Sequence, residues 1–459
     1  MSTLSGHSFY FIGVGGIGMS GLARYFRRRG AEVAGYDRTP SELTNQLQAE
    51  GIEVQFNENP LLIPDAFRNS ASGEVMVVRT PAVPASSPLL KYWEERGARI
   101  LKRAEVLGMV TEDRRTIAVA GTHGKTTVST MLAHLLTAGG VRCNAFLGGI
   151  AVNYGTNVLL NDDAVVNVVE ADEYDRSFLR LHPSESIITA MDPDHLDIYG
   201  TAEAMFAAYT EFAALSTGML LVHQRVADHF STHPGAVSYA LDHTGSPRAE
   251  HVRVEAGRYV FDLVAEGHVL RDLQLGMPGR HNVENAIAAS TMALRQGVSP
   301  AALREGLASF RGVSRRFEVR IHSDQVVFID DYAHHPKELD ACIGSARELH
   351  PGKRICGIFQ PHLFTRTRDL AAEFGRSLAA LDELILLDIY PAREEPIDGI
   401  TSQWLLDQVP MTNKVVTSKE GLLGLLKERP LEVLLTMGAG DIDRSVPAIE
   451  RLLNERYHP

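Results

Sequence analysis

Cysteine, tryptophan and long apolar runs are all scarce in this sequence. Three cysteines and two tryptophans occur in 459 residues. Cys143, Cys342 and Cys356 lack the spacing of metal ligands, and a set this sparse predicts reduced thiols in a cytoplasm rather than a disulfide framework. No apolar run approaches the length of a membrane-spanning helix. The first run, residues 9–14, is also too short for a signal peptide. We therefore expect a cytoplasmic protein without a membrane partner.

An excess of basic charge is also missing. The chain has 45 lysines and arginines against 57 aspartates and glutamates, and its net charge is −12. This balance argues against a nucleic-acid partner, because such proteins present a basic surface to phosphates. The length predicts about three domains. A composition of 44% apolar residues supplies enough side chains for a core in each.

The most informative stretch present is residues 118–127, Ala-Val-Ala-Gly-Thr-His-Gly-Lys-Thr-Thr. A β-branched run at residues 116–119 predicts a strand before it, and a helical pattern follows from Thr127 to about residue 136. Glycines in such a loop let backbone N–H groups approach phosphate oxygens, and the helix N-terminus adds positive charge. Lys125 is placed to reach terminal phosphates and Thr126 to hold Mg²⁺. The spacing departs from the standard P-loop, which has a glycine where Val119 stands.

A second glycine loop lies near the start of the chain. Residues 8–14 predict a strand, Gly13–Gly18 a tight turn, residues 19–29 a helix, and residues 32–36 a second strand that ends at Asp37. This is the beginning of a Rossmann-like nucleotide-binding domain, with Asp37 where an acidic residue meets a ribose hydroxyl. NAD is the obvious ligand, but the geometry serves any nucleotide diphosphate. A third strand is followed by a turn at residues 79–84. This turn either contacts a ligand at the carboxyl edge of the sheet or is a plain surface turn.

Acidic residues follow two later apolar runs. The strand predicted at residues 164–169 ends in Glu170–Glu173, which is where a metal carboxylate belongs downstream of a phosphate loop. The run at residues 186–191 leads to Asp192–Asp197, which includes His195. We interpret His195 as a ligand of a second divalent ion, as a residue that orients an acid, or as a structural histidine.

An alternating pattern at about residues 237–275 predicts an antiparallel, strand-rich insert. Residues 279–285 then open an alanine-rich helix in which Asn282 and Asn285 share one face. Two exposed amides there are predicted either to read an adenine edge or to cap the helix.

The composition changes again at residues 312–317, where Arg315 and Arg316 either clamp a phosphate or belong to a solvated hinge. A strand at residues 326–329 ends in Asp330–Pro336. Another at residues 354–359 precedes His362 and two predicted anion binders, Arg366 and Arg368. We therefore predict an α/β protein of three domains: a Rossmann-like domain at 1–107, a central P-loop ATPase-like domain at 108–312, and a C-terminal Rossmann-like domain at 313–459.

Taken together, these stretches resemble the Mur ligases over the whole chain. The resemblance rests on these segments: residues 13–18, 121–127, 170–173, 194–195, 279–285, 315–317, 330–336 and 360–368. It implies an ATP-dependent ligase of cytoplasmic peptidoglycan precursor synthesis. ATP would phosphorylate the lactyl carboxylate of UDP-N-acetylmuramate, and L-alanine would displace phosphate to form an amide. The implied cofactors are ATP and Mg²⁺, and the implied assembly is a monomer or weak homodimer.

The resemblance also implies residue roles. For ATP it indicates Gly121, Thr122, His123, Gly124, Lys125, Thr126, Thr127, Asn282, Asn285, Arg316 and Asp331. For the UDP-sugar it indicates Gly13, Gly15, Gly16, Ile17, Gly18, Asp37, Thr80 and His123. For metal it indicates Thr126, Glu170 and His195. For the amino acid it indicates His334, His362 and Arg366. The implied catalytic set is Lys125, Glu170, His195, Arg316 and Asp331.

Alternatives remain at this point. A nicotinamide oxidoreductase would use residues 13–18 and Asp37 but leaves residues 121–127 without a role. A catalytically silent nucleotide-binding regulator would not need Lys125 and Glu170. Within the family, a ligase that recycles murein tripeptide is the main rival. Ala190 and Leu363 depart from the family's pattern, and Leu363 leaves more of the carboxylate recognition to Arg366. Hinges near residues 108 and 313 are expected for domain closure.

Overall fold

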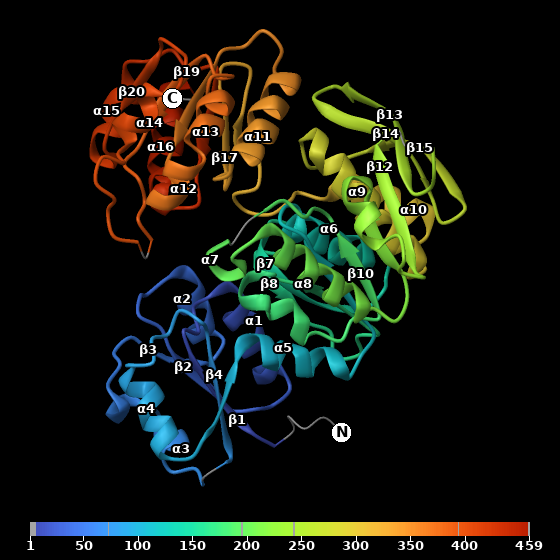
Figure 1. Ribbon diagram of the computed structural model, residues 1–459, viewed down its shortest axis with the longest axis vertical. Helices are drawn as coiled ribbons and strands as arrows, with labels where there is room; N and C mark the ends of the chain where they lie inside the picture. Colours follow the sequence, from blue (N-terminus) through green and yellow to red (C-terminus); the bar gives the residue numbers. More distant parts are fainter. Residues whose placement is uncertain (1–5, 72, 194–195, 242–243, 393, 458–459) are drawn as a thin grey trace. The chain divides into compact units, whose positions relative to one another are not determined.

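The computed structural model describes residues 6–71, 73–193, 196–241, 244–392 and 394–457. In these residues the chain forms three sheets flanked by helices (Figure 1), which confirms the α/β class. Contacts divide it into two compact units. The first comprises Met1–Ala249, Leu263–Leu270 and Asn285–Leu307, and the second Glu250–Asp262, Arg271–Glu284 and Ala308–Pro459.

The first sheet and its helices form the Rossmann-like domain. Its strand order is β3-β2-β1-β4-β5, and every pairing is parallel. The strands are β1 Ser8–Ile12, β2 Val33–Tyr36, β3 Glu53–Gln55, β4 Val75–Arg79 and β5 Arg99–Lys102, and the helices are α1 Ile17–Arg28, α2 Glu42–Ala49, α3 Asp65–Arg68 and α4 Pro88–Glu95. The chain leaves β1 toward β2 on one side and adds β4 on the other. The carboxyl edge between β1 and β4 is therefore a topological switch point, where ligands bind in such folds.

Aromatic side chains fill both faces of this sheet. On one face Phe9 stacks on Phe26 of α1, with ring centroids 3.8 Å apart. On the other face Tyr10 packs against Phe67 and Trp93. Alternate residues of β1 thus serve opposite cores, which is why residues 9–12 of this strand are all apolar and fully buried.

The second sheet has ten strands in the order β15-β14-β13-β12-β11-β10-β6-β9-β7-β8. Its strands are β6 Thr116–Ala120, β7 Cys143–Ala151, β8 Thr156–Leu159, β9 Val166–Glu170, β10 Glu185–Ile188, β11 Leu220–His223, β12 Ala236–Leu241, β13 Arg248–Glu255, β14 Arg258–Ala265 and β15 His268–Gln274. The helices that accompany it are α5 Arg103–Glu112, α6 Lys125–Ala138, α7 Leu196–Tyr199, α8 Ala202–Ala214, α9 Arg280–Arg295 and α10 Pro300–Ser309. Strand β6 pairs in parallel with β9 and β10, so the segments that follow these three strands meet at one edge.

The predicted insert is strand-rich, as expected, but it is not antiparallel throughout. Strand β12 pairs in parallel with both β11 and β13. The next two connections are two-residue turns, Ala256-Gly257 and Glu266-Gly267, in which all four residues have positive φ. Such turns join antiparallel strands, so only β13 to β15 fit the prediction. The alternating pattern specified strands and could not specify their direction.

The first two sheets are linked within one compact unit. Helix α5 continues through residue 108, where the sequence predicts a domain boundary and a hinge. Helix α1 contacts β7 and β8 of the second sheet. The guanidinium of Arg24, which is buried, bonds to Glu50 and to Asn157 Oδ1 at 2.8 Å. A hinge at residue 108 would have to break the bond between Arg24 and Asn157, which join the two sides of that residue.

The third sheet has the order β16-β17-β21-β18-β19-β20, and only β16 is antiparallel to its neighbour. Its strands are β16 Glu318–His322, β17 Val327–Asp331, β18 Ile355–Phe359, β19 Glu383–Leu386, β20 Lys414–Val416 and β21 Val433–Met437. Its helices are α11 Pro336–Leu349, α12 Phe364–Asp369, α13 Ala371–Leu378, α14 Ser402–Asp407, α15 Lys419–Lys427 and α16 Val446–Tyr457. Across the described residues, no helix is both long and apolar enough to cross a bilayer.

Candidate active site

The loop between β1 and α1 requires glycine for two different reasons. Gly13 has φ of 89°, a left-handed conformation that favours glycine. A Cβ at Gly13 would also lie 2.6 Å from Thr80 Cγ2, so Thr80 borders the loop from the end of β4. Gly16 is the N-cap of α1 and has no side chain to bond the first-turn N–H groups. These groups are the donors that a phosphate accepts from in a Rossmann-like fold.

Asp37 holds this loop in place. Its Oδ2 accepts a hydrogen bond from Gly15 N at 2.8 Å, and its Oδ1 accepts one from Thr39 N at 3.2 Å. The sequence predicted that Asp37 would meet a ribose hydroxyl. In this structure the carboxylate fixes the glycine loop, and the ribose contact stays a prediction.

The loop between β6 and α6 is equally dependent on glycine. Gly121 has φ of 131°, and a Cβ there would lie 2.1 Å from Thr189 Oγ1. Gly124 has φ of 82°, and a Cβ there would lie 2.8 Å from Asn285 Oδ1. Helix α6 begins directly at Lys125, two residues earlier than the sequence predicted. The loop therefore has the strand–loop–helix form that a phosphate cradle requires.

Lys125 is fixed by two acceptors. Its Nζ lies 2.7 Å from Gly121 O and 2.9 Å from Glu173 Oε1, and the side chain of Glu173 is 1% exposed. Burial opposes the charged form of Lys125, but the carboxylates of Glu173 and Glu170 outweigh it and raise the pKa of the ammonium above its ordinary value. Lys125 is thus a positive charge held beside the glycine loop. Its partner Glu173 was not distinguished from its acidic neighbours by sequence reasoning.

Glu170 is placed beside the same loop by the sheet register. It is the last residue of β9 and pairs with Val119 of β6, two residues before Gly121. Its Oε2 accepts a hydrogen bond from Gly148 N at 3.1 Å, and a Cβ at Gly148 would lie 2.2 Å from both carboxylate oxygens. Gly148 is therefore a second residue that the sequence did not reveal, because its role depends on a partner 22 residues away.

In the second unit, polar groups follow the ends of β17 and β18. Asp331, the last residue of β17, is buried, and its carboxylate accepts from Phe317 N at 2.7 Å and Ala333 N at 2.6 Å. Burial raises the pKa of Asp331 to about 7, although Arg316 acts to lower it. The guanidinium of Arg316 lies 4.9 Å from the centre of the Tyr332 ring and 3.7 Å from Glu338 Oε1.

His334 has a defined tautomer. Its Nδ1 lies 3.0 Å from Tyr332 O and 3.1 Å from Glu338 Oε2, and both atoms are acceptors. Nδ1 therefore carries the proton, which leaves Nε2 as the acceptor atom of the neutral ring. Burial lowers the pKa of His334 below its ordinary value and favours that neutral form.

His362 and Arg366 adjoin His334. The rings of His334 and His362 are 6.0 Å apart at 68°, and His362 Nδ1 lies 3.3 Å from Arg366 Nη1. His362 also stacks on Tyr390, with ring centroids 5.7 Å apart. Leu363, which follows, has φ of 71° and donates its N–H to Tyr390 O at 2.9 Å. The three residues predicted to receive an amino acid are thus brought together.

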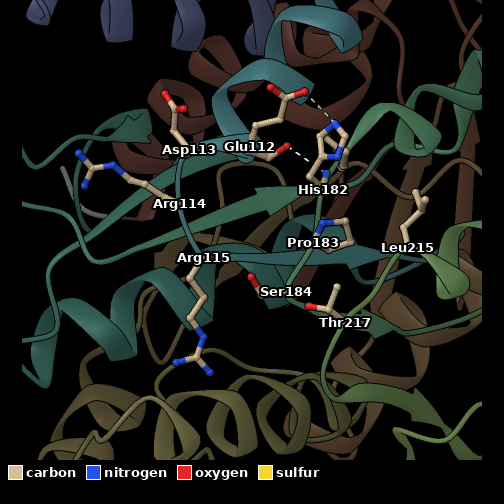
Figure 2. Close-up of a pocket in the computed structure, with 11 residues that line it drawn as sticks. Glu112, Asp113, Arg114, Arg115, His182, Pro183, Ser184, Leu215 and Thr217 are labelled. Carbon is tan, nitrogen blue, oxygen red and sulfur yellow. Dashed lines mark hydrogen bonds and ion pairs between the residues drawn. The ribbon is translucent and has the colours of Figure 1, made fainter. Parts of the chain in front are cut away.

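A separate cavity of about 410 Å³ lies at the opposite edge of the second sheet. It is lined by segments that precede β6 and β10, including Arg115, His182 and Ser184, and Figure 2 shows the dashed contact between Glu112 and His182. The phosphate-type loop lies at the carboxyl end of β6, so this cavity is distinct from the candidate active site.

Known proteins match the chain over nearly its whole length. Family models match it at residues 8–115 ("Mur ligase family, catalytic domain"), 119–293 ("Mur ligase middle domain") and 315–440 ("Mur ligase, glutamate ligase domain"). A UDP-N-acetylmuramate–L-alanine ligase of Phocaeicola vulgatus is 49% identical over 98% of both chains, and one of Flavobacterium johnsoniae is 48% identical over 97% of this chain and 98% of its own. The chain belongs to the Mur ligase family.

Solved structures agree with this assignment. The Mur ligase MurC of Thermotoga maritima, a UDP-N-acetylmuramate–alanine ligase, has a TM-score of 0.81 and 27% identity over 98% of this chain and 99% of its own. A murein peptide ligase of Psychrobacter arcticus has a TM-score of 0.68 at 20% identity over 98% and 99%, and therefore shares the fold.

The exposure predicted for two amides of this Mur ligase needs correction, and two of its arginines have partners in the structure. Asn282 and Asn285 are buried rather than exposed; Asn282 Nδ2 donates to Pro278 O at 2.6 Å. The guanidinium of Arg315 donates to Gly438 O and pairs with Asp330. Both partners belong to the third sheet or directly follow one of its strands, so Arg315 bonds within this domain. Arg368 pairs with Asp369 at an exposed position outside the histidine cluster. The partners of Asn282 and Arg368 lie within four residues of them in the chain, whereas those of Arg315 are 15 and 123 residues away.

The metal prediction of this Mur ligase has a partial structural basis. Oxygen ligands from one carboxylate and one hydroxyl suit Mg²⁺, which keeps several waters and binds phosphates. Glu170 ends β9 beside the loop, and Thr126 lies in the first turn of α6, so this donor set fits the ion. His195 lies outside the described residues. Within them, no three histidine, cysteine or carboxylate side chains gather as a metal site.

Proposed function

We propose that this chain joins L-alanine to the lactyl carboxylate of UDP-N-acetylmuramate with the cleavage of ATP. The products are UDP-N-acetylmuramoyl-L-alanine, ADP and phosphate. The observation that carries the proposal is the near-complete match, at 48–49% identity, to proteins that are named UDP-N-acetylmuramate–L-alanine ligases. The fixed Lys125 beside a glycine loop supports the use of ATP.

The chemistry follows from the weakness of a carboxylate as an acyl donor. A carboxylate oxygen attacks the γ-phosphorus of ATP, the bond to the bridging oxygen breaks, and ADP leaves. The amine of L-alanine then attacks the acyl carbon, loses a proton, and phosphate leaves. The barrier falls mainly through positioning and charge stabilisation, because the phosphoryl group carries most of the charge.

The phosphate end of this reaction is assigned to the glycine loop at residues 121–127. Lys125 faces the terminal phosphates with an ammonium that Gly121 O and Glu173 hold in position. Thr126 and Glu170 are assigned to Mg²⁺, which when bound neutralises phosphate charge. Asn282, Asn285, Arg316 and Asp331 are proposed as further ATP contacts, and His195 as a contact of a second ion.

The amino-acid end is assigned to the second unit. Arg366 offers a guanidinium that matches the carboxylate of L-alanine. His334 Nε2 is unprotonated in the tautomer set by Tyr332 O and Glu338, so it suits an amine that must lose a proton. His362 lies between them and contacts both side chains.

The sugar nucleotide is assigned to the first glycine loop. Gly13, Gly15, Gly16, Ile17 and Gly18 would hold the diphosphate, with Asp37, Thr80 and His123 as further contacts. The same loop would serve a dinucleotide, but an oxidoreductase has no use for the second loop at residues 121–127. We keep the domain boundaries at residues 107/108 and 312/313 as a proposal, with the first one inside α5.

Phosphate release tests this proposal. The protein is mixed with ATP, Mg²⁺ and UDP-N-acetylmuramate, and L-alanine, glycine, L-serine or murein tripeptide is added separately. We expect release that depends on L-alanine. Glycine is expected to compete weakly, because one methyl group contributes only about 1–3 kcal/mol to discrimination.

Other outcomes have distinct meanings. Release with tripeptide alone would move the chain to a peptide-recycling ligase. Absence of release in every mixture, together with retained nucleotide binding, would indicate a silent regulator. A change in reduced-nicotinamide absorbance would indicate an oxidoreductase.

A further inference from the structure

Arg103 occupies the space that a side chain at Gly18 would need. A Cβ built on Gly18 would lie 2.8 Å from Arg103 Nη1 and 3.0 Å from Arg103 Cδ. Gly18 is not among the glycines with positive φ, and it lies inside α1, where alanine is the better helix former. The backbone therefore does not require glycine at this position. The side chain of Arg103 does.

The other edge of the Arg103 guanidinium is tethered to the acidic stretch after β9. Nη2 lies 3.3 Å from Asp172 Oδ2, and the Arg103 side chain is 20% exposed. Asp172 stands two residues after Glu170. Arg103 itself is the first residue of α5, at the end of β5. One side chain thus spans from the first glycine loop to the segment that carries the proposed metal carboxylate.

The charge around Gly18 is positive. Helix α1 has no acidic residue in its first turn, and its N-cap, Gly16, has no side chain that could bond the N-terminal N–H groups. The N-terminus of α1 and the Nη1 edge of Arg103 are therefore both positive, and both lie beside Gly18. A doubly charged diphosphate at the glycine loop is complementary to both, since a guanidinium binds phosphate through paired N–H donors.

We propose that Arg103 binds the diphosphate of the sugar nucleotide, and that Gly18 is a glycine because the Arg103 side chain must lie against it. This inference rests on the proposed function, which places a UDP-sugar at residues 13–18. Asp172 is then a positioning residue: it holds one edge of the guanidinium and directs the other toward the loop.

Calorimetric titration with UDP and, separately, with ATP tests this assignment. Arg103→Ala is expected to weaken UDP binding about 10- to 100-fold, the equivalent of one lost charge-assisted contact. ATP binding should stay at the wild-type value. Arg103→Lys keeps the charge without the paired donors and should fall between wild type and Arg103→Ala.

Lys102→Ala is the matched control. Lys102 precedes Arg103 and forms a similar ion pair with the same segment, since its Nζ lies 3.0 Å from Asp175 Oδ2. No glycine of the first loop adjoins Lys102 in the way that Gly18 adjoins Arg103. Its UDP affinity should equal that of the wild type if the diphosphate contact, rather than loss of an ion pair to the second sheet, explains the effect.

A double-mutant cycle separates Arg103 from direct contact at Gly18. Gly18→Ala adds a methyl group against the flexible end of Arg103, so the chain should fold and Arg103 should be displaced. Gly18→Ala should therefore lower UDP affinity in the wild type but have no effect on it in the Arg103→Ala background. A full additional loss in that background would mean that Gly18 acts on the ligand itself and would overturn this explanation of Gly18.

Two further results would overturn the proposal. One is wild-type UDP affinity in Arg103→Ala. The other is an equal loss of UDP and ATP binding in Arg103→Ala and Lys102→Ala, which would make the role structural. If the wild-type protein does not bind UDP at all, the proposed function fails as well, and this outcome is distinct from a failure confined to the variants.

Discussion

The ammonium of Lys125 and the carboxylate of Glu173 form a 2.9 Å ion pair, and the Glu173 side chain is almost fully shielded from solvent. Gly121 O, at 2.7 Å, is the second acceptor for the same ammonium. These two bonds use two of the three donors of a lysine ammonium. The pair therefore sets the direction in which the remaining N–H points, and it does so within the loop that we assign to ATP.

We predict that Lys125→Met abolishes ATP-dependent ligation and also destabilises the protein. Removal of one partner leaves Glu173 buried without its counter-charge, which costs about 3–5 kcal/mol in the free energy of unfolding. The double variant Lys125→Met/Glu173→Gln should recover most of that stability and remain inactive. Urea unfolding and phosphate release measure the two effects. A double variant as unstable as the single one would contradict this account, and UDP binding should survive in both.

Gly148→Ala is predicted to raise the Mg²⁺ concentration needed for activity. The added Cβ would overlap both carboxylate oxygens of Glu170, 2.2 Å away, so the proposed metal ligand must move. Displacement of a ligand support typically costs about 10- to 100-fold in metal affinity. Gly344→Ala is the control, because a Cβ at that position meets nothing within 4 Å. An unchanged Mg²⁺ requirement in Gly148→Ala would remove Glu170 from the metal site.

Asp331 is predicted to make stability fall as the pH rises from about 4 to about 7. Its pKa is 3.8 when unperturbed and about 7 in the folded protein, so the folded state binds the proton more tightly across that range. Its contribution, at most about 4 kcal/mol, is complete below the unfolded pKa and is lost as the pH passes the folded value. The free energy of unfolding of the wild type minus that of Asp331→Asn should therefore fall steadily over this range, because asparagine does not titrate. Urea unfolding at several pH values would show it, and a constant difference would refute it.

Asn157→Ala is predicted to loosen the first sheet from the second. The Asn157 side chain bonds Arg24 Nη1 at 2.8 Å and Ser20 Oγ at 3.0 Å, and its loss removes one hydrogen-bond partner from each of these buried residues. The free energy of unfolding is expected to fall by about 1–3 kcal/mol, and the amide hydrogens of α1 should exchange faster than in the wild type. Arg28→Ala is a matched control on the same helix: its pair with Asp162 is exposed, so it should change stability by less than about 1 kcal/mol. Equal effects of the two variants would contradict the prediction.

Sequence reasoning predicted most of the parallel strands and both glycine loops, because these depend on neighbours in the chain. The apolar run before Gly121 and the glycine spacing after it are local signals, and the structure places β6, the loop and α6 there. It failed where a partner is distant. The antiparallel direction predicted for residues 237–275 was wrong for β12, because alternation specifies a strand and not its neighbour. The residue roles were carried by the family resemblance, and they stay predictions.

The sequence by itself determined the three-sheet α/β architecture, the two phosphate-type loops and the Mur ligase family, because short motifs and hydrophobic periodicity are written in consecutive residues. Only the tertiary structure decided that Lys125 pairs with Glu173, that Glu170 is supported by Gly148, and that Gly18 makes room for Arg103. Those relationships join residues 22 to 85 positions apart. They depend on which strands lie side by side and how much solvent the sheets exclude, and the order of residues along the chain does not state either.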